Sequence, residues 1–478
     1  MASLTHATLN ATVAQARYAT LQNDCKIRKP LSKRISAAMI TTLYRTEWGK
    51  MGMARLMGCL LAVLITAGFK VPWENQKLQS EGLLGQVMEA RQRLTGESVK
   101  LLKGAVGTRR VRVGRRRFVD VPVIGIVGRE MALAIGDGQQ IKIARAIKRD
   151  SGLEVTTPGF SVSMRRENGI NSNMACIVPD KGTVLAVKYP VDNENNRFGG
   201  NVPVIEAVYT PYSPELATEE VVEHGLRVTN DFINRAYVRL AERGVMSRAF
   251  LGRKIIDVVP KDVLRALLMN EHIDPGEFKT SGLTGTLCER VLTVIATNGG
   301  KAYGYSISSA GARGLVQMIP STYRLIQSRY PAAGLNPDFA AGMADPVNAI
   351  AAQIVLCDSD WEAIQSRSPI GVEKIGPYLA AAYNGGVGRV LSVLAYNETD
   401  WMEEPDSSRA PTKTVTERVR VRVRTRRGRT QAKYVLKRYT VPIFRSQTSK
   451  YVNQYHWIND FLLARSTREP RSKEPRTP

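Results

Sequence analysis

Apolar residues recur every three to four positions over much of the second half of the chain, a spacing that buries one side of an α-helix. Val221, Val222 and Leu226 are an example of this spacing. Pro260 precedes another such run and marks a helix start. The pattern predicts helices over residues 75–104, 214–250, 261–272, 286–297, 322–330, 347–356, 378–383 and 451–463.

Strict alternation of apolar and other residues, which is typical of β-strands, occurs in two separate segments. In the first, valines alternate with other residues from Val111 to Val123, and turn-forming glycines and asparagines follow. In the second, valine and arginine alternate from Arg418 to Arg424, Arg427-Gly428 supplies a turn, and a return strand runs over 434–441. The first segment predicts a small β-rich domain, and the second predicts an added basic β-hairpin.

These elements together predict an α+β protein of several domains. The predicted parts are a basic leader (1–50), a signal peptide or signal anchor (51–70), a helical spacer (71–107), a β-rich domain (108–212), a mostly helical domain (213–464) and a disordered tail (465–478). The helical domain itself has a core (255–400), the basic hairpin (413–443) and a C-terminal helix (448–463).

The segment from Leu56 to Phe69 is an uninterrupted apolar run of 14 residues that follows a strongly basic stretch. This arrangement is typical of an export signal, and the run is short for a comfortable membrane span. A buried core helix is the alternative, but it gives the basic flank no purpose. We therefore expect an exported protein, anchored through residues 56–69 and located in the cell envelope.

The chain is strongly basic, with 68 Lys and Arg against 43 Asp and Glu and a formal net charge of +25. Such a charge predicts an anionic partner, either nucleic acid or an anionic envelope polymer bound by the basic hairpin. Only Tyr434 and Tyr439 lie near the hairpin's basic run, and the export signal also disfavours nucleic acid. The five cysteines and four histidines are scattered, so the sequence predicts neither a metal site nor a cofactor.

Three sequence blocks occur in order in the helical domain. They are Ser308-Ser309-Ala310-Gly311-Ala312-Arg313-Gly314-Leu315-Val316-Gln317-Met318-Ile319-Pro320, Asp345-Pro346-Val347-Asn348-Ala349-Ile350 and Ala380-Ala381-Ala382-Tyr383-Asn384-Gly385-Gly386-Val387-Gly388-Arg389-Val390. Together they resemble the S-x-A-G-A-x-G-L-M-Q-x-M-P, D-P-x-x-N-I and A-A-Y-N-x-G-x-G-R-V segments of the soluble lytic transglycosylases, glycoside hydrolase family 23. The resemblance covers residues 255–400, with a C-terminal echo of E-T-x-x-Y-V at Thr448 to Val452.

The resemblance implies a goose-lysozyme-like helical fold and a cleft that binds the glycan strands of peptidoglycan. Its substrate-binding residues would be Ser308, Gln317, Met318, Tyr383 and Asn384. The amide and hydroxyl groups among them suit hydrogen bonds to sugar hydroxyl and acetamido groups, although helix caps and turns would use the same residue types. Tyr383 is expected to hydrogen-bond the catalytic acid.

Cleavage of a glycosidic bond needs a carboxylic acid that is kept neutral. The family's glutamate stands about nine residues before the serine that matches Ser308, but Gly299 occupies that place here. Residues 263–275 resemble the family's I-L-x-x-x-x-x-E-S-x-x-x-P helix end, which makes Glu271 the expected acid and residues 276–305 an insertion. Glu289 and a site without an acid are the alternatives.

Position on the helix supports Glu271, because it follows Leu267 by four residues and Leu268 by three and so ends a buried stripe. Burial there is expected to raise its pKa. The resemblance implies a lytic transglycosylase that cleaves the bond between N-acetylmuramic acid and N-acetylglucosamine with formation of a 1,6-anhydro ring. A hydrolase acting on the same bond and a non-catalytic peptidoglycan-binding or scaffold protein are the alternative functions.

Overall fold

A computed structural model describes residues 82–113, 117–138, 140–191, 205–274, 276–279, 284–395, 402, 412–424, 430–442 and 446–466. Several predicted features lie outside these residues. They are the basic leader, the apolar run 56–69, the hairpin turn at 427–428 and the tail beyond residue 466.

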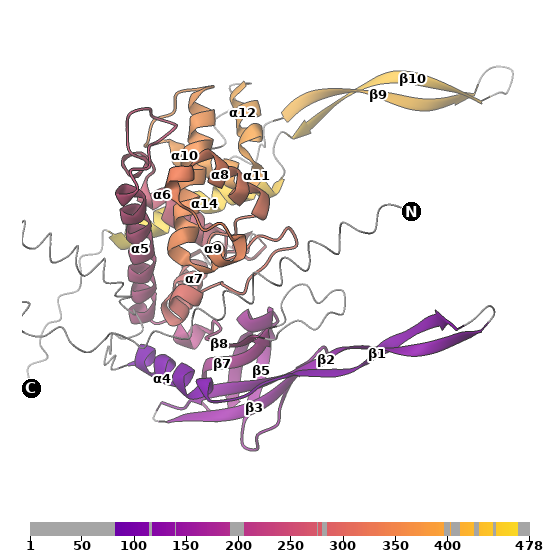
Figure 1. The fold of residues 1–478 in the computed structure, drawn as a ribbon, viewed down its shortest axis with the longest axis vertical. Coiled ribbons are helices and arrows are strands. Elements are labelled where there is room, and N and C mark those ends of the chain that lie inside the picture. Colours follow the sequence, from indigo (N-terminus) through magenta and orange to yellow (C-terminus); the bar gives the residue numbers. More distant parts are fainter. Residues whose placement is uncertain are drawn as a thin grey trace, which may run out of the picture. The chain divides into compact units, whose positions relative to one another are not determined.

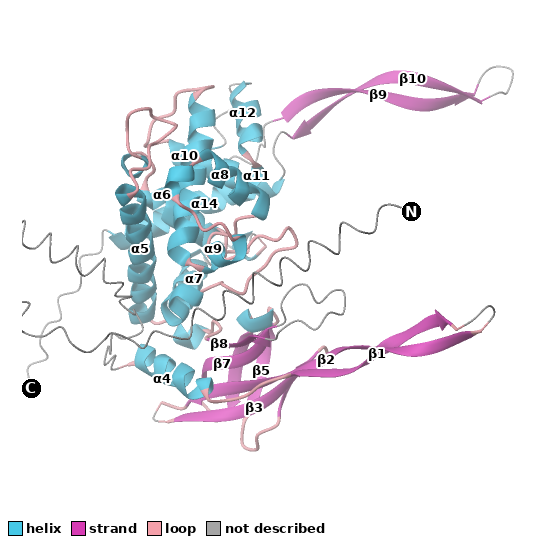
Figure 2. Cartoon of the chain, viewed as in Figure 1, coloured by secondary structure: helices cyan, strands magenta, loops and turns pink. Residues whose placement is uncertain are grey.

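A six-stranded antiparallel sheet forms the first part of the described chain (Figures 1 and 2). Its path is β4-β3-β2-β7-β8, and β1 pairs with the first half of β2 outside that path. The strands are β1 (Leu101–Arg112), β2 (Phe118–Gly136), β3 (Ile141–Arg149), β4 (Gly152–Val155), β7 (Thr183–Val191) and β8 (Ile205–Tyr209). A separate hairpin pairs β5 (Ser161–Arg166) with β6 (Asn173–Val178).

The two faces of the sheet are buried by different elements. In β2, Met131, Leu133 and Ile135 belong to the hydrophobic core shared with the helices, whereas the intervening Ala132 and Ala134 pack with helix α4 (Leu83–Thr95). This alternation follows from the two-residue period of a strand. The predicted helical spacer (71–107) contains α4, and this helix covers one face of the sheet.

Helices form most of the described chain after the sheet. They are α5 (Glu219–Glu242), α6 (Lys261–Asn270), α7 (Thr284–Asn298), α8 (Pro320–Arg329), α9 (Phe339–Ala344), α10 (Pro346–Gln365), α11 (Ile375–Gly385), α12 (Val387–Ala395) and α14 (Ser446–Ser466). The helix α10 is buried along most of its length and packs against α5, α8, α9, α11 and α12. Its start is fixed by Asp345, whose side chain accepts a hydrogen bond from Val347 N, and by Pro346 in the first turn.

The structure confirms the α+β class and most of the predicted elements. Differences occur at the ends: β1 begins at Leu101, where the apolar spacing predicted helix, and α14 continues to Ser466. The short helices α9 and α12 were not predicted. Strands β9 (Thr412–Arg424) and β10 (Thr430–Pro442) form the predicted basic hairpin. No helix within the described residues is both long enough and apolar enough to cross a membrane.

Asn298, the last residue of α7, joins the sheet to the helices. Its side-chain oxygen accepts hydrogen bonds from Arg91 of α4 at 2.6 Å and from Thr210 N at 2.9 Å. Its nitrogen donates to Thr210 O at 2.8 Å. Asn298 is 2% exposed, and burial lowers the pKa of the Arg91 guanidinium. One amide thus satisfies three groups that are shielded from water.

Replacing Asn298 with Leu should destabilise the fold strongly, because it removes the partner of the Thr210 N–H and C=O groups and one of the two acceptors of Arg91. We expect a loss of about 2–4 kcal/mol in the free energy of unfolding, measured by urea denaturation. Asn234→Leu is the matched control, because that exposed amide accepts only from the Lys261 ammonium, and its effect should stay below about 0.5 kcal/mol. Equal effects of the two substitutions would contradict the role given to Asn298.

Candidate active site

Glu271 lies immediately after the last residue of α6, at the end of its buried stripe. Val263, Leu264, Leu267 and Leu268 are all buried and orient the helix toward the core. The amide of Glu271 still donates to Leu267 O at 3.2 Å, so the backbone continues the helical turn at this residue. The predicted position of the carboxyl group at the end of the apolar stripe is confirmed.

Glu271 is partly buried at the end of α6. Burial raises its pKa from the ordinary 4.5 to about 7, and a hydrogen bond from Tyr451 opposes this rise. At neutral pH a substantial fraction of the carboxyl group is therefore protonated and able to deliver a proton.

Helix α14 closes over the end of α6 through reciprocal hydrogen bonds. The Tyr451 hydroxyl donates to Glu271 Oε1 at 2.6 Å, and Asn270 Nδ2 donates to the backbone oxygen of Tyr451 at 2.9 Å. Gln454 Nε2 adds a longer bond to Ile273 O at 3.4 Å. These contacts hold the glutamate between two elements that are 180 residues apart in the sequence.

The segment from Ser308 to Met318 folds into a tight loop whose Leu315 and Val316 carbonyl groups are bonded by His272 and by Tyr383 of α11. Gly314 has a φ of 70°, and a Cβ atom there would lie 2.3 Å from Met343 O. Only glycine fits this close approach to α9. Gln317 also has a positive φ, of 45°, and its side chain donates to Gly314 O at 2.8 Å.

Two side chains from other segments, His272 and Tyr383, hydrogen-bond the loop. The ring of His272, the residue after Glu271, makes a 2.8 Å hydrogen bond to Leu315 O, and the Tyr383 hydroxyl donates to Val316 O. Burial lowers the pKa of His272 to about 4, so the ring stays neutral at ordinary pH. A neutral ring that bonds a carbonyl oxygen must donate from Nε2.

Tyr383 lies close enough to Glu271 that the carboxylate raises its pKa, together with the larger effect of burial. The expectation that its phenol hydrogen-bonds the acid is wrong, because its proton goes to Val316 O instead. Tyr451, from α14, makes the bond to Glu271. The two tyrosines therefore have different roles. The Tyr383 hydroxyl bonds the loop at Val316 O, and the Tyr451 hydroxyl bonds the Glu271 carboxyl group.

The other predicted substrate residues have distinct positions. Ser308 is exposed, and its hydroxyl accepts from Ala312 N at 3.0 Å and so shapes the turn. Met318 is 2% exposed, which makes it a core residue and not a sugar-contacting one. Asn384 is half-buried, and its oxygen accepts from the Thr448 hydroxyl at 2.8 Å. Its amide nitrogen is a donor that suits a sugar oxygen.

Helix α7 lies between Glu271 and Ser308 in the sequence and packs against α5 and α14. Tyr303 from this segment stacks on the His272 ring with a centroid distance of 3.5 Å. Glu289, the alternative acid, lies on α7 and pairs with Arg465 at 3.1 Å. An ion-paired carboxylate is a poor proton donor, so the geometry favours Glu271 over Glu289.

A second carboxyl group, that of Asp360 on α10, shares these surroundings. Burial raises its pKa to about 7, and its charge in turn raises the pKa of Tyr383. Sequence reasoning missed Asp360, although an aspartate within the apolar helix α10 is a detectable signal. It also missed the roles of Tyr451, Thr448 and His272, the first two of which lie in the C-terminal echo of the family motif.

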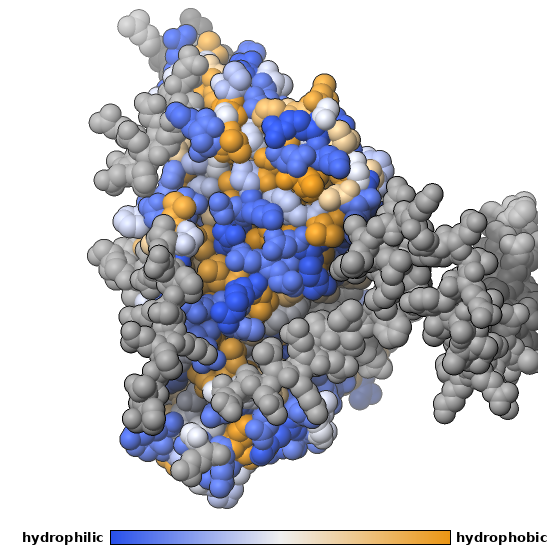
Figure 3. Space-filling view, turned by 90° about the vertical axis from the view of Figure 1, so that its left-hand side faces the viewer, coloured by the Kyte–Doolittle hydropathy of each residue, from blue (hydrophilic) through white to orange (hydrophobic). Residues whose placement is uncertain are grey.

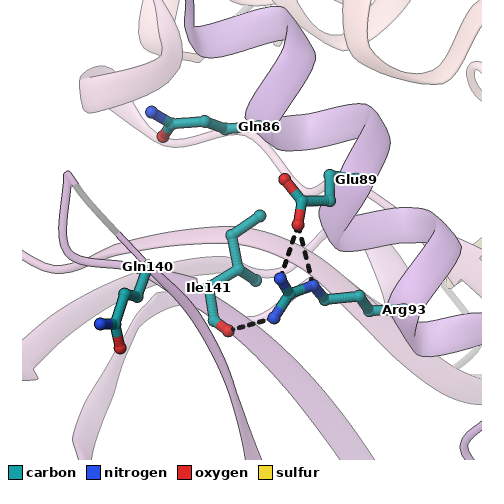
Figure 4. A pocket seen from close by; sticks show the side chains of 5 residues that line it. All are labelled: Gln86, Glu89, Arg93, Gln140 and Ile141. Atoms are coloured by element: carbon teal, nitrogen blue, oxygen red, sulfur yellow. Dashed lines mark hydrogen bonds and ion pairs between the residues drawn. The ribbon is translucent and has the colours of Figure 1, made fainter.

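Two described hollows involve other parts of the chain. One, of about 270 Å³, lies between α4 and β3, and its Arg93 already pairs with Glu89 and donates to Ile141 O (Figure 4). The other, of about 430 Å³, is lined by residues that include Phe250 and Trp361. Within the described part of the chain, no three His, Cys, Asp or Glu side chains come together as metal ligands would.

Comparisons with protein-family models, with curated proteins and with solved structures find no match to this chain. The function must therefore be argued from the site itself.

The raised pKa of Glu271 predicts how stability depends on pH. Folding favours the neutral carboxyl group of Glu271. Its contribution to the free energy of unfolding is therefore complete below pH 4.5 and is lost as the pH rises through about 7. Glu271→Gln removes the titration and keeps an acceptor for Tyr451. The variant should match wild type near pH 4 and exceed it by about 3 kcal/mol at pH 9, measured by urea denaturation. A difference that does not change with pH would contradict the raised pKa.

Proposed function

We propose that this chain is a peptidoglycan lytic transglycosylase whose helical part, with residues 255–400 as its core, has a lysozyme-like fold. The observation that carries the proposal is the Glu271 carboxyl group, which burial keeps partly protonated at neutral pH and which Tyr451 holds in place. Two of the three sequence blocks support the proposal, because the Tyr383 hydroxyl of one donates to Val316 O of the other beside Glu271.

In the proposed reaction, Glu271 first donates its proton to the oxygen that links N-acetylmuramic acid to N-acetylglucosamine. The bond from that oxygen to the muramoyl C1 breaks, and the carboxylate then accepts the proton of the muramoyl C6 hydroxyl. The C6 oxygen bonds to C1 and closes a 1,6-anhydro ring. One carboxyl group serves as acid and then as base, so no water is consumed.

The neighbouring Asp360 bears on the choice between transglycosylation and hydrolysis. Inverting hydrolysis needs a second carboxyl group that is ionised and activates water. Burial raises the pKa of Asp360 to about 7, the same value as for Glu271, so at neutral pH part of this group is ionised and hydrolysis stays the competing outcome.

The proposed partners are peptidoglycan glycan strands and, through the β9–β10 hairpin, anionic polymers of the envelope. Arg418 and Arg420 of this hairpin are exposed, and the Arg418 guanidinium lies 4.5 Å from the centre of the Tyr434 ring. We further propose export and anchoring through residues 56–69, which lie outside the described residues. Nucleic acid is not proposed as a partner.

The test is the product released from intact sacculi. Wild type should release fragments with 1,6-anhydromuramoyl ends, detected by mass spectrometry, whereas Glu271→Gln should lose about 10²- to 10⁴-fold in rate, because the amide transfers no proton. Glu289→Gln is the matched control and should retain wild-type turnover, because that carboxylate is held by Arg465.

Each other outcome has a definite meaning. An active Glu271→Gln variant together with an inactive Glu289→Gln variant would show that Glu289 of α7 is the catalytic acid. Reducing ends in the wild-type digest would establish hydrolysis. Binding of sacculi by wild type without any product would establish the non-catalytic binding protein.

The separate hydrogen bonds of Tyr451 and Tyr383 give a second test of the proposed reaction. Tyr451→Phe removes the hydrogen bond that lowers the pKa of Glu271, so the alkaline limb of the pH profile of kcat/KM should move to higher pH. Turnover should fall about 10-fold, the scale for one oriented hydrogen bond. Tyr383→Phe should also reduce turnover but leave the limb in place, because its hydroxyl bonds Val316 O. A limb that moves in Tyr383→Phe alone would reverse these assignments.

A further inference from the structure

The β1–β2 pair continues beyond the rest of the sheet as a two-stranded ribbon (Figure 2). The second half of β2, from Arg129 to Gly136, pairs with β3, whereas its first half, from Phe118, pairs with β1 alone. We call residues 103–124 the distal ribbon. Both of its faces therefore lie outside the layers that bury the sheet.

The cross-strand register separates the side chains of the distal ribbon into two faces. Val111 lies opposite Val119, and Arg109 lies opposite Val121. Residues directly opposite share a face, so valines dominate one side. The other side carries Arg112 opposite Phe118 and Arg110 opposite Asp120, the last two joined at 3.4 Å.

The apolar side chains of the distal ribbon are unusually exposed. Val113 and Phe118 are each 54% exposed, and Ile124 is 62% exposed. Others that stand open to solvent are Val106, Val119, Val121 and Val123. On the face of the molecule in Figure 3, by contrast, hydrophobic residues occur in patches interspersed with hydrophilic ones. Val119, Val121 and Val123 lie on one face of the ribbon and Phe118 and Ile124 on the other. The exposed valines of the first face mark an interaction surface.

The charge of the distal ribbon specifies what kind of surface it meets. Between Lys103 and Ile124 the sequence contains seven basic residues and one acidic residue, Asp120. The described arginines, Arg109, Arg110, Arg112 and Arg117, are all exposed. The partner must therefore offer negative charge and an apolar region within a few ångströms of each other.

We propose that the distal ribbon binds the surface of an anionic lipid bilayer and lies in the plane of the interface with its valine face toward the acyl chains. An amphipathic element with a basic polar face binds a membrane in this way, its apolar face buried about 5–10 Å into the boundary. Arginine stems are long enough to bring their guanidinium groups to phosphate headgroups around the ribbon edge.

Other partners fit the surface less well. Nucleic acid would use the arginines but gain nothing from five valines, since its recognition relies on charge, hydrogen bonds and aromatic stacking. A second copy of this chain would bring two strongly basic ribbons together. The bilayer is the partner that complements both faces. This inference is independent of the reaction proposed for Glu271.

The test uses the full chain and a readout local to the ribbon. Amide hydrogen exchange of residues 101–124 is followed with vesicles of equal parts phosphatidylglycerol and phosphatidylcholine, and with phosphatidylcholine alone. We expect protection of the ribbon by the anionic vesicles only. A local readout is needed because residues 56–69 could hold the chain on the vesicles without the ribbon.

The apolar face is tested by replacing Val113, Val119, Val121 and Val123 together with Thr. Threonine keeps the branched side chain that suits a strand and removes apolar surface. Ribbon protection by the anionic vesicles should vanish. The matched control is Val238→Thr with Val372→Thr, valines that are each 55% exposed on the helical part, and it should behave as wild type.

A second variant keeps the proposal testable if the threonine variant fails to fold. Replacing Arg109, Arg110 and Arg112 with Gln should weaken ribbon protection and reduce its dependence on salt. An unprotected wild-type ribbon, or full protection in the threonine variant, would overturn the proposal. Protection by duplex DNA but not by vesicles would show that the partner of the ribbon is nucleic acid. Protection that rises with protein concentration in the absence of vesicles would show that the partner is a second copy of this chain.

Discussion

The carboxyl group of Glu271 is enclosed between the end of α6 and the first turns of α14, and the rest of the site is built around that enclosure. Moving an ionised carboxylate out of water is costly, so burial favours the neutral acid and raises its pKa to about 7. The Tyr451 hydroxyl satisfies one carboxyl oxygen without supplying a positive charge. A cation in that place would have lowered the pKa and abolished the proton donor.

The packing around this carboxyl group extends into the sheet. His272 stacks on Tyr303, whose amide donates to the Tyr209 hydroxyl of β8 at 3.3 Å. The same segment ends α7 at Asn298, where the sheet and the helices share buried hydrogen bonds. The additional segment 276–305 thus separates the glutamate from the loop in sequence and also ties the site to the sheet.

Sequence periodicity predicted most of the helices, a β-rich part and the basic hairpin of β9 and β10, because these depend on local spacing of apolar residues. It also placed Glu271 at the end of a buried stripe, since four preceding residues decide that position. It could not predict which tyrosine bonds the acid, because Tyr451 and Tyr383 reach the site from distant helices and one phenol proton has several possible acceptors. The local pattern likewise missed β1 at Leu101, whose strand state depends on pairing with β2.

The central claim is that the fold holds Glu271 as a neutral acid at neutral pH, and a carboxyl titration tests it most directly. With ¹³C-labelled glutamate, the resonance that Glu271→Gln removes can be assigned and followed with pH in the wild-type protein. The account predicts a midpoint near pH 7. A midpoint near 4.5, the ordinary value for a glutamate, would show that the carboxyl group is ionised and would contradict its role as the proton donor.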